Sequence, residues 1–535
     1  MSTVSVLRFR VLLPIILFVC PTLASADGSI EGTVTFWGDP GGGTQIEISA
    51  MESPWTDQID TTVVGLNDSF SLSVPDGDYY IQANMDRDGG FGDPEPDDVV
   101  VLWDSNGDGR WDQVTVDGGT VTGVDIDLGF VYVDIDAAGA DDGSSWADAF
   151  NDVQNGINLA VSGVDVWVAE GTYVPGVNRS DSFLPKPGVR VYGGFAGVES
   201  LRSERDWNAN ETILSGDIGV IGTHTDNCYH VVRAEGSTPS ALLDGITIEH
   251  GYAHVGNTVD DQGAGIRARG GGVTLANCTV RDNSALSTGG GAMANLGGTI
   301  KAYNSSFIDN SAAGGHGGGY YGNAASAQPQ TLINCVFSGN YAYRGGGIAL
   351  EGTGLAPVLA NLTAGGNSAG DLGPGLFTYS TQAYTVHNSI FWGNGPAPVG
   401  FWTTAPTINY SIVEGGWAHG GTHILTDDPS FVDAGQGNLR LELDSPAIDA
   451  GDNSAVPIDL HDADGNHWTD EPIKRDRDFN NRFRNLPYIP NTGNAAPDEW
   501  PVDMGAYEAW DPTLIFEHDF DSGDIDPWTR VVGMP

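Results

Sequence analysis

The residues best suited to chemistry form one short acidic run near the N-terminal end of the chain. Oxygen donors recur at positions 1, 3, 5 and 9 of this run, position 7 offers a backbone carbonyl, and glycine stands at position 6. This spacing suits Ca²⁺, which prefers oxygen ligands, and the glycine permits a sharp bend of the loop. We therefore predict a structural Ca²⁺ site, with a plain acidic turn as the alternative. The five ligand positions are Asp104, Asn106, Asp108, Arg110 and Asp112.

The predicted loop is incomplete as an EF-hand, because Thr115 occupies position 12, where a bidentate glutamate is usual. It resembles the calcium loops of the dockerin or thrombospondin type more closely. A second acidic run has the same alternation of oxygen donors but places its glycine at position 4, so ion binding and a solvated turn both stay open there. Its candidate ligands are Asp462, Asp464, Asn466 and Asp470.

The chain of 535 residues carries a formal net charge of −49. A surplus of this size repels phosphate backbones and anionic lipid headgroups, which argues against nucleic-acid and membrane-surface partners. Divalent cations are the natural counterions, although excess carboxylates also keep extracellular proteins soluble. We expect Ca²⁺ as the cofactor, and an extracellular polysaccharide or a cell-surface component as the partner.

The N-terminal segment 1–26 has the features of an export signal. Arg8 and Arg10 precede an apolar run at 11–19, and small residues at 24–26 supply a cleavage site. The run is shorter than the ~20 residues of a membrane-spanning helix, and no later apolar run is longer. We therefore predict a cleaved signal peptide, no transmembrane span, and a location outside the cell or on its surface.

A repeat of about 27 residues dominates the centre of the chain. Its unit is Asn-(Cys/Ser)-x-(Phe/Val)-x-x-Asn-x-Ala, and successive first asparagines lie 27, 30, 27 and 27 residues apart. Apolar residues alternate within each unit, which is the period of a strand. Stacked coils pair every backbone group with the next coil, so the pattern predicts an all-β, right-handed parallel β-helix. The asparagine pairs are Asn277 and Asn283, Asn304 and Asn310, Asn334 and Asn340, Asn361 and Asn367, and Asn388 and Asn394.

The repeated asparagines, glycines and cysteines have structural roles in such a fold. Asparagine tolerates left-handed backbone angles and can hydrogen-bond its copies above and below, forming a ladder. Glycine triplets such as 317–319 mark a corner that needs positive φ and close approach of the coils. Three cysteines follow the signal, and Cys278 and Cys335 share one phase of the repeat, which predicts buried thiols and no disulfide framework.

A capping helix is expected before the first coil. Ser145 could cap it, and Trp146, Phe150, Val153 and Ile157 recur at spacings of four, three and four, which gives one apolar face. The helix would close the end of the β-helix, where the interior and an unpaired strand edge are otherwise exposed.

Several motifs carry a family resemblance. Segments such as Ala169-Glu-Gly-Thr-Tyr173, Leu214-Ser-Gly-Asp217 and Leu243-Asp-Gly-Ile-Thr-Ile248 resemble the secreted bacterial right-handed parallel β-helix proteins of the choice-of-anchor type. The glycine and asparagine units resemble polymorphic outer-membrane-protein repeats. The segment Ser445-Pro-Ala-Ile-Asp-Ala-Gly451 resembles the way that family closes. The resemblance covers roughly residues 130–510 and implies a fold and secretion, without a particular activity.

Residues 27–128 show short alternating strands broken by turns such as Pro75-Asp-Gly77. We expect a small β-sandwich there, which resembles the carboxypeptidase-regulatory-like, or transthyretin-like, modules that precede many secreted domains. The predicted organisation is a signal peptide at 1–26, the sandwich at 27–128, the β-helix with its closing region at 129–510, and a tail at 511–535. The tail is either a sorting or anchoring segment or a strand docked on the last coil.

Catalysis finds little support in the sequence, and we name no catalytic residue. Asp260-Asp261 and Gly315-His316-Gly317 match two parts of a polygalacturonase-like set, but the Asn-Thr-Asp and Arg-Ile-Lys parts are missing. Glycoside hydrolysis needs two carboxylates flanking the scissile bond. The glycine corner explains His316 without chemistry. The arginines that a lyase could use as a base form no evident constellation: Arg267, Arg269, Arg281 and Arg344.

Binding is the function that the sequence favours. A long repetitive face offers aromatic side chains that can stack on sugar rings, and the alternative is that these side chains fill the coil interior. We expect a secreted or cell-surface adhesin, spacer or carbohydrate-binding scaffold stabilised by Ca²⁺. A polysaccharide lyase or glycoside hydrolase is the alternative. The aromatic residues are Tyr320, Tyr321, Tyr341, Tyr343, Tyr379, Trp392, Trp402 and Trp417.

Overall fold

The structure is a computed structural model that describes most of the chain between residues 28 and 510. The expected signal peptide at 1–26 and the expected tail at 511–535 lie outside the described residues. The described segments are 28–38, 45–53, 58–85, 99–105, 111–256, 260–295, 297–323, 328–352, 354–459, 471–484, 486, 488–496 and 500–510.

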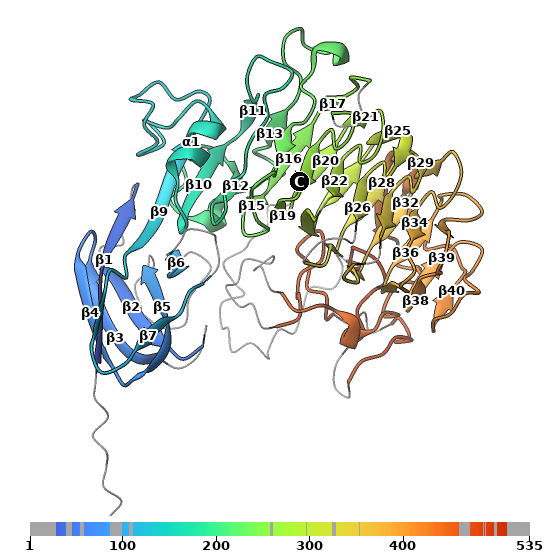
Figure 1. The fold of residues 1–535 in the computed structure, drawn as a ribbon. Coiled ribbons are helices and arrows are strands. Elements are labelled where there is room, and N and C mark those ends of the chain that lie inside the picture. Colours follow the sequence, from blue (N-terminus) through green and yellow to red (C-terminus); the bar gives the residue numbers. More distant parts are fainter. Residues whose placement is uncertain are drawn as a thin grey trace, which may run out of the picture.

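The centre of the chain is a parallel β-helix, so the predicted all-β fold is confirmed (Figure 1). Each central coil crosses four sheets, which we number I to IV in chain order. Sheet I holds β9 (Ile126–Val133), β10 (Val164–Ala169), β12 (Arg190–Phe195), β15 (Leu242–Asp244), β19 (Gly272–Ala276), β23 (Thr299–Tyr303), β27 (Thr331–Ile333), β31 (Val358–Ala360), β35 (Thr385–His387) and β38 (Thr407–Asn409). Sheet II holds β11 (Gly171–Tyr173), β13 (Thr212–Ser215), β16 (Ile246–Glu249), β20 (Thr279–Arg281), β24 (Ser306–Ile308), β28 (Val336–Ser338), β32 (Thr363–Gly365), β36 (Ile390–Trp392), β39 (Ser411–Val413) and β40 (Ile424–Leu425).

The other two sheets complete the coils. Sheet III is short, because only a few residues separate the second asparagine of each repeat from the glycine corner. It holds β17 (Tyr252–Ala253), β21 (Ser284–Ala285), β25 (Ser311–His316), β29 (Tyr341–Arg344) and β33 (Ser368–Ala369). Sheet IV holds β14 (Val232–Arg233), β18 (Ile266–Arg269), β22 (Ala292–Asn295), β26 (Tyr320–Asn323), β30 (Ile348–Glu351), β34 (Leu376–Tyr379) and β37 (Val399–Phe401).

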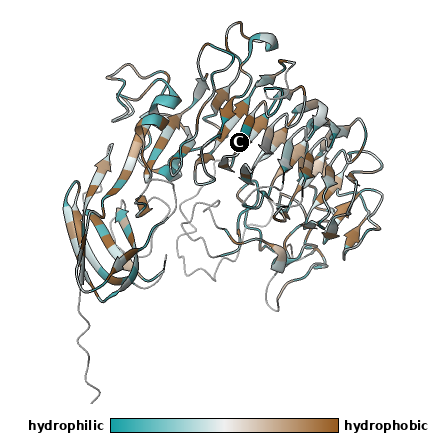
Figure 2. Ribbon diagram, viewed as in Figure 1, coloured by the Kyte–Doolittle hydropathy of each residue, from teal (hydrophilic) through white to brown (hydrophobic). Residues whose placement is uncertain are grey.

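One hydrophobic core runs through the coils. Figure 2 shows hydrophobic residues, coloured brown, along the strands of the coils. Phe307 and Phe337 stack on successive coils, with their ring centroids 4.9 Å apart and their planes inclined by 4°. Cys228, Cys278 and Cys335 are free and buried in this core, which confirms the prediction of buried thiols. The interior is therefore filled by equivalent residues of stacked repeats, as the period of the sequence requires.

The predicted asparagine ladder is present. Asn283 Nδ2 donates to Asn310 Oδ1 at 3.0 Å, and Asn310 Nδ2 donates to Asn340 Oδ1 at 3.1 Å. Asn340 Nδ2 continues the ladder to Asn367 Oδ1 at 2.9 Å. The first asparagine of every repeat has a φ between 46° and 55°, the left-handed region in which asparagine is favoured. The first asparagine of each repeat therefore lies at a turn, and Asn334 and Asn361 also donate to the preceding first asparagine, which makes a second buried ladder.

A helix precedes the first full coil, but it is shorter than expected. The helix α1 (Val153–Leu159) begins after Asp152, whose side chain accepts a hydrogen bond from Gln154 N. Ser145 is not its cap, and Trp146 packs instead with other aromatic rings, 4.8 Å from the ring of Tyr132. The pattern was misleading because Trp146 lies in a bend and Phe150 forms a β-bridge with Val133, and both side chains are partly buried without a helical face. Four 3₁₀ turns are η1 (Arg202–Glu204), η2 (His224–Asp226), η3 (Ala434–Gln436) and η4 (Asn453–Ala455).

The N-terminal residues form two mainly antiparallel sheets around a second core. Strand β1 pairs in parallel with β9, which in turn pairs with β10, so this part of the chain extends sheet I. The division of the chain at residue 128 and the resemblance to carboxypeptidase-regulatory-like modules remain predictions. One sheet holds β1 (Gly28–Trp37), β4 (Ser69–Val74) and β8 (Thr120–Thr122), and the other holds β2 (Gln45–Met51), β3 (Gln58–Gly65), β5 (Gly77–Met85), β6 (Val99–Leu102) and β7 (Val114–Val116).

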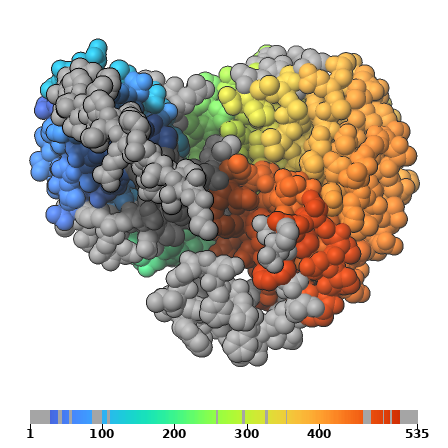
Figure 3. Space-filling model, turned by 90° about the horizontal axis from the view of Figure 1, so that it is seen from below, coloured from blue at the N-terminus to red at the C-terminus, as the bar shows by residue number. Residues whose placement is uncertain are grey.

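After the last coil the chain turns back along the corner between sheets I and II (Figure 3). Asn334 Nδ2 donates to Arg475 O at 2.8 Å, and Asn388 Nδ2 donates to Asp452 O at 3.0 Å. Gly505 N donates to Asn388 O at 2.8 Å. Asparagines at the first repeat position thus also fasten the closing segment. Its strands are β41 (Phe431–Asp433) and β42 (Asn438–Leu441).

Candidate ligand-binding surface

The predicted Ca²⁺ loop is described only at its two ends. Asp104 Oδ2 accepts a hydrogen bond from Ser162 Oγ at 2.9 Å, and Asp112 Oδ2 accepts one from Ser105 N at 2.9 Å. The three other proposed ligands, Asn106, Asp108 and Arg110, lie outside the described residues. Both terminal carboxylates are held near the ends of the loop, which fits an oxygen-lined cation site. Ca²⁺ binding there remains a prediction.

The second acidic run lies wholly outside the described residues, so Asp462, Asp464, Asn466 and Asp470 are not placed. Within the part of the chain that is described, no group of three or more His, Cys, Asp or Glu residues is arranged to hold a metal ion.

The outer face of sheet IV gathers polar and aromatic side chains. Strand alternation sends Tyr320, Ile348 and Leu376 into the coil core, while their neighbours Tyr321 and Phe377 form a separate cluster outside it. Equivalent residues stack in register, so each outward position forms a column along the coils. Two columns cross this face: one holds Arg267, Tyr321, Ala349 and Phe377, and the other holds Arg269, Asn323, Glu351 and Tyr379.

The glycine corner brings a third column beside this face. His316 and Arg344 each precede a glycine triplet and pair with one another in β25 and β29. Gly317 and Gly345 have φ values of +71° and +62°, and a Cβ at Gly317 would lie 2.3 Å from Tyr320 O. Only glycine fits so tight a bend, and the bend aims the preceding side chains towards the outer face of sheet IV.

Four of these side chains form one polar cluster, the Arg344 cluster, made of His316, Arg344, Glu351 and Asp371. Arg344 Nε donates to Asp371 Oδ2 at 2.7 Å, and its NH1 lies 3.2 Å from His316 Nε2. His316 Nδ1 is hydrogen-bonded to Glu351 Oε1, whose other oxygen accepts from the Tyr321 hydroxyl at 3.2 Å. The chain of contacts joins three successive coils and fixes the orientation of each group.

Three half-exposed aromatic side chains, the aromatic rim, stand around this cluster: Tyr343, Tyr379 and Trp402. Their exposed fractions are 43%, 44% and 47%. The Arg344 guanidinium lies 3.8 Å from the centroid of the Trp402 ring, and Trp402 meets Tyr379 edge to face at 5.2 Å. Phe377 lies fully buried beneath them. The rim therefore presents rigid aromatic surface beside hydrogen-bonding groups.

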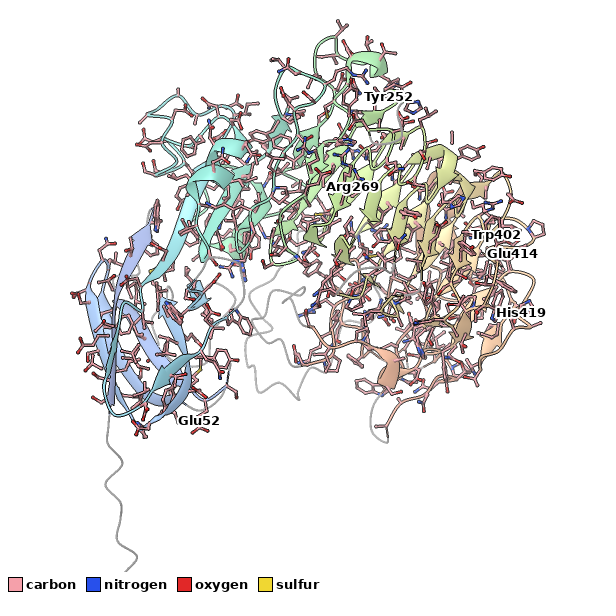
Figure 4. The ribbon with its side chains drawn as sticks, viewed as in Figure 1. Glu52, Tyr252, Arg269, Trp402, Glu414 and His419 are labelled. Atoms are coloured by element: carbon pink, nitrogen blue, oxygen red, sulfur yellow. The ribbon has the colours of Figure 1, made fainter. Side chains whose placement is uncertain are left out.

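A second polar cluster, the Arg267 cluster, lies on the same face nearer the first coils and holds His230, Glu235, Asp260 and Arg267. Arg267 binds Glu235 at 2.6 Å and Asp260 at 3.2 Å. Its NH1 lies 2.7 Å from His230 Nε2, while His230 Nδ1 donates to Gly263 O at 2.9 Å. Burial and the neighbouring Arg267 guanidinium lower the pKa of His230 to about 3, so its imidazole is neutral. Figure 4 marks Arg269 toward the first coils and Trp402 toward the last.

The clusters revise two expectations from the sequence. Arg267 and Arg344 do belong to side-chain constellations, which residues separated by a full coil assemble. His316 is more than a corner residue, because it links Glu351 with Arg344. Asp260 and His316, the two matches to a polygalacturonase-like set, fall in different clusters. The available signal was the shared position of His316 and Arg344 before glycine triplets, 28 residues apart.

The aromatic candidates divide between surface and interior. Tyr320 is fully buried and donates to Gln330 Oε1 at 2.6 Å, so it belongs to the core. Tyr321 is nearly buried, whereas Tyr341 is exposed together with the three residues of the aromatic rim. Trp392 and Trp417 are partly buried. Four of the eight sequence candidates are therefore exposed and available to a ligand.

Among the comparisons with known proteins, a family model supports the fold of the central coils. Residues 222–414 match the family model described as the right handed beta helix region. Among solved structures, the pectate lyase Pel9A is 11% identical, with 71% of this chain and 96% of that chain covered and a TM-score of 0.36. A family 28 exopolygalacturonase from Yersinia enterocolitica is 12% identical, with 73% and 93% covered and a TM-score of 0.14. No curated protein matches the chain significantly. No helix among the described residues is long and apolar enough to cross a membrane.

Proposed function

We propose that this chain is an extracellular or cell-surface protein that binds polysaccharide on the outer face of sheet IV and is stabilised by Ca²⁺. The observation that carries the proposal is the aromatic rim, three half-exposed rings held around the Arg344 cluster. Sugar rings stack on aromatic faces, and ligand sites combine apolar surface with a few fixed polar groups. The rod of stacked coils makes the protein a scaffold that displays this surface.

The charge of the surface favours an uncharged polysaccharide over a uronic acid polymer. In the Arg344 cluster Asp371 binds Arg344, and a second carboxylate, Glu351, is bound to His316. Arg267 is bound by both Glu235 and Asp260. Since these arginines already have carboxylate partners, an acidic sugar would meet an excess of negative charge. The net charge of −49 adds long-range repulsion of the same sign.

Retention of the intact protein on immobilised polysaccharides tests this function. We expect binding to at least one neutral polymer in a panel of glucans, xylans and galactans, and weaker binding to polygalacturonate. Trp402→Ala should weaken binding by about tenfold, because it removes a central aromatic contact. The matched control is Trp500→Ala, since Trp500 is 41% exposed on the closing segment, outside the two clusters.

The outcomes separate the competing functions. Stronger retention by polygalacturonate than by neutral polymers would overturn the charge argument and leave binding in place. Equal retention of the Trp402→Ala and wild-type proteins would remove the aromatic rim as the site. Shortened polymer chains after incubation with the wild-type protein would replace the binding function with a polysaccharide lyase or glycoside hydrolase.

A further inference from the structure

A loop between sheets II and IV contains three buried oxygen atoms that have no hydrogen-bond partner. The loop leaves β13 and returns at Cys228, whose N–H donates to Gly216 O at 2.9 Å and closes the neck. The orphaned atoms are Asp217 Oδ1, Asp226 Oδ1 and Asn227 Oδ1. Buried acceptors in folded proteins nearly always have a partner, so three in one short loop require an explanation.

The other polar atom of each side chain is already engaged, which fixes all three orientations. Asp217 Oδ2 accepts from Gly222 N at 2.8 Å, and Asp226 Oδ2 accepts from Val220 N at 2.9 Å. Asn227 is only 1% exposed, and its Nδ2 donates to His250 O at 2.7 Å. The remaining oxygens are therefore held in place without a donor among the described residues.

The backbone places these three residues at the neck of one loop. The bond between Gly216 and Cys228 sets Asp217 opposite Asn227 at the neck, and Asp226 directly precedes Asn227 in the chain. Both carboxylates bind amides of the same turn of the loop, at Val220 and Gly222. The carboxylates at the two ends of the loop therefore both bind its central turn.

The Arg179 side chain, which contacts the neck of this loop, does not satisfy these oxygens. Arg179 Nε donates to Asn227 O at 2.7 Å, and its NH2 donates to Tyr252 O at 3.1 Å. Its guanidinium therefore binds backbone carbonyls and supports the neck from outside. One oxygen of each carboxylate and the amide oxygen of Asn227 have no donor. Together they form a set of oxygen ligands with net negative charge, which is the ligand chemistry of a hard divalent cation.

We infer that Asp217, Asp226 and Asn227 bind a Ca²⁺ ion, at a site distinct from the loop at 104–112. Water molecules and backbone carbonyls would complete the coordination, as is usual for Ca²⁺. Mg²⁺ fits less well because it demands a stricter octahedral shell. The chain runs from Asn227 directly to His230 of the Arg267 cluster, so the ion would also order the entrance to the proposed binding face.

Calcium titration of the full chain tests the site. Asp108→Ala serves as the background, because it removes the separate loop predicted at 104–112. In this background we expect uptake of Ca²⁺ by calorimetry, and a further Asp226→Asn change should weaken that uptake by more than about tenfold. Asp444→Asn, an exposed carboxylate on the closing segment, is the control and should leave uptake unchanged.

A second readout keeps the inference testable if one variant folds poorly. Ca²⁺ should raise the melting temperature of the background protein and protect the 217–227 loop from proteolysis, and both effects should be lost in Asp217→Asn and Asp226→Asn. Equal Ca²⁺ affinity in the background and in a folded Asp226→Asn variant would overturn the site. Absence of Ca²⁺ uptake in the background protein would also overturn it and assign the three oxygens to bound water.

Discussion

The buried asparagine ladder makes a quantitative prediction at its central rung. Asn340 is fully buried and takes part in four hydrogen bonds through its side chain. Its Oδ1 accepts from the backbone and side-chain nitrogens of Asn310, and its Nδ2 donates to Phe307 O and Asn367 Oδ1. One side chain thus connects three coils.

The cost of Asn340→Ala follows from the groups that it leaves unpaired. Asn310 N loses its acceptor and Phe307 O loses its side-chain donor, while Asn367 Oδ1 keeps the bond from Asn340 N at 3.1 Å. A buried polar group without a partner costs about 1–3 kcal/mol, and Asn310 N becomes such a group, whereas Phe307 O stays within the parallel ladder between β24 and β28, so we predict a loss of about 1–3 kcal/mol in the free energy of unfolding. Asn340→Asp keeps the acceptor but loses both donor contacts, and it should be at least as destabilising at neutral pH.

Urea unfolding followed by tryptophan fluorescence and circular dichroism measures this loss. The exposed Asn208 offers a matched control, and Asn208→Ala should shift the midpoint little. The two probes should give coincident transitions before a free energy is extracted, because stacked repeats can lose cooperativity. A loss below about 1 kcal/mol for Asn340→Ala would refute the reasoning, since it would mean that water replaces the ladder at little cost.

Two further predictions concern buried ionisable groups. Burial and the neighbouring Asp503 raise the pKa of Asp449 to about 7. A raised folded pKa costs stability as pH rises from the unfolded value to about 7, so Asp449→Asn should stabilise the protein by less than about 1 kcal/mol at pH 4 and by up to about 4 kcal/mol at pH 8. Melting temperatures at both pH values check this against Asp444→Asn, and an equal gain at the two would contradict it. Burial raises the pKa of the Cys335 thiol to about 12, so a thiol reagent should label Cys335 only after unfolding; rapid labelling of the folded protein would show that the core opens.

The spacing of the repeats was sufficient to predict the fold, because each repeat forms one coil and equivalent residues of successive coils pack on one another. Asparagines 27 to 30 residues apart predict one coil per repeat, and the hydrogen bonds between Asn283, Asn310 and Asn340 confirm that register. The short capping helix was harder to place. Trp146 and Phe150 match a helical period, yet Trp146 lies in a bend and Phe150 in a β-bridge, and Asp152 provides the cap. Periodicity reports burial and does not say which element produces it.

The polar clusters could not be assembled from the sequence for a different reason. Arg344, Asp371 and Glu351 become neighbours only when the length of every intervening loop is known, since one residue of slip moves a side chain to the other face. The glycine corners fix the register of the residues next to them, and they place His316 beside Arg344. A search restricted to residues that precede repeated glycines would have found this pair, but neither the aromatic rim nor Asp371.

The same repeat leaves room on a structural rod for the proposed binding surface. Asparagine ladders and glycine corners use inward and corner positions, which leaves the outward positions of sheet IV unconstrained by coil packing. Polar and aromatic residues occupy those positions, and Glu351 and Tyr379 differ although they are paired in register. On this face Arg267 binds both Glu235 and Asp260, and Arg344 lies over the half-exposed Trp402, although neutral small residues would pack there at lower desolvation cost. Arg281 on sheet II is also bound by two carboxylates, Glu249 and Glu211, so the half-exposed aromatic rim is a stronger argument for the proposed ligand surface on sheet IV than the ion pairs are.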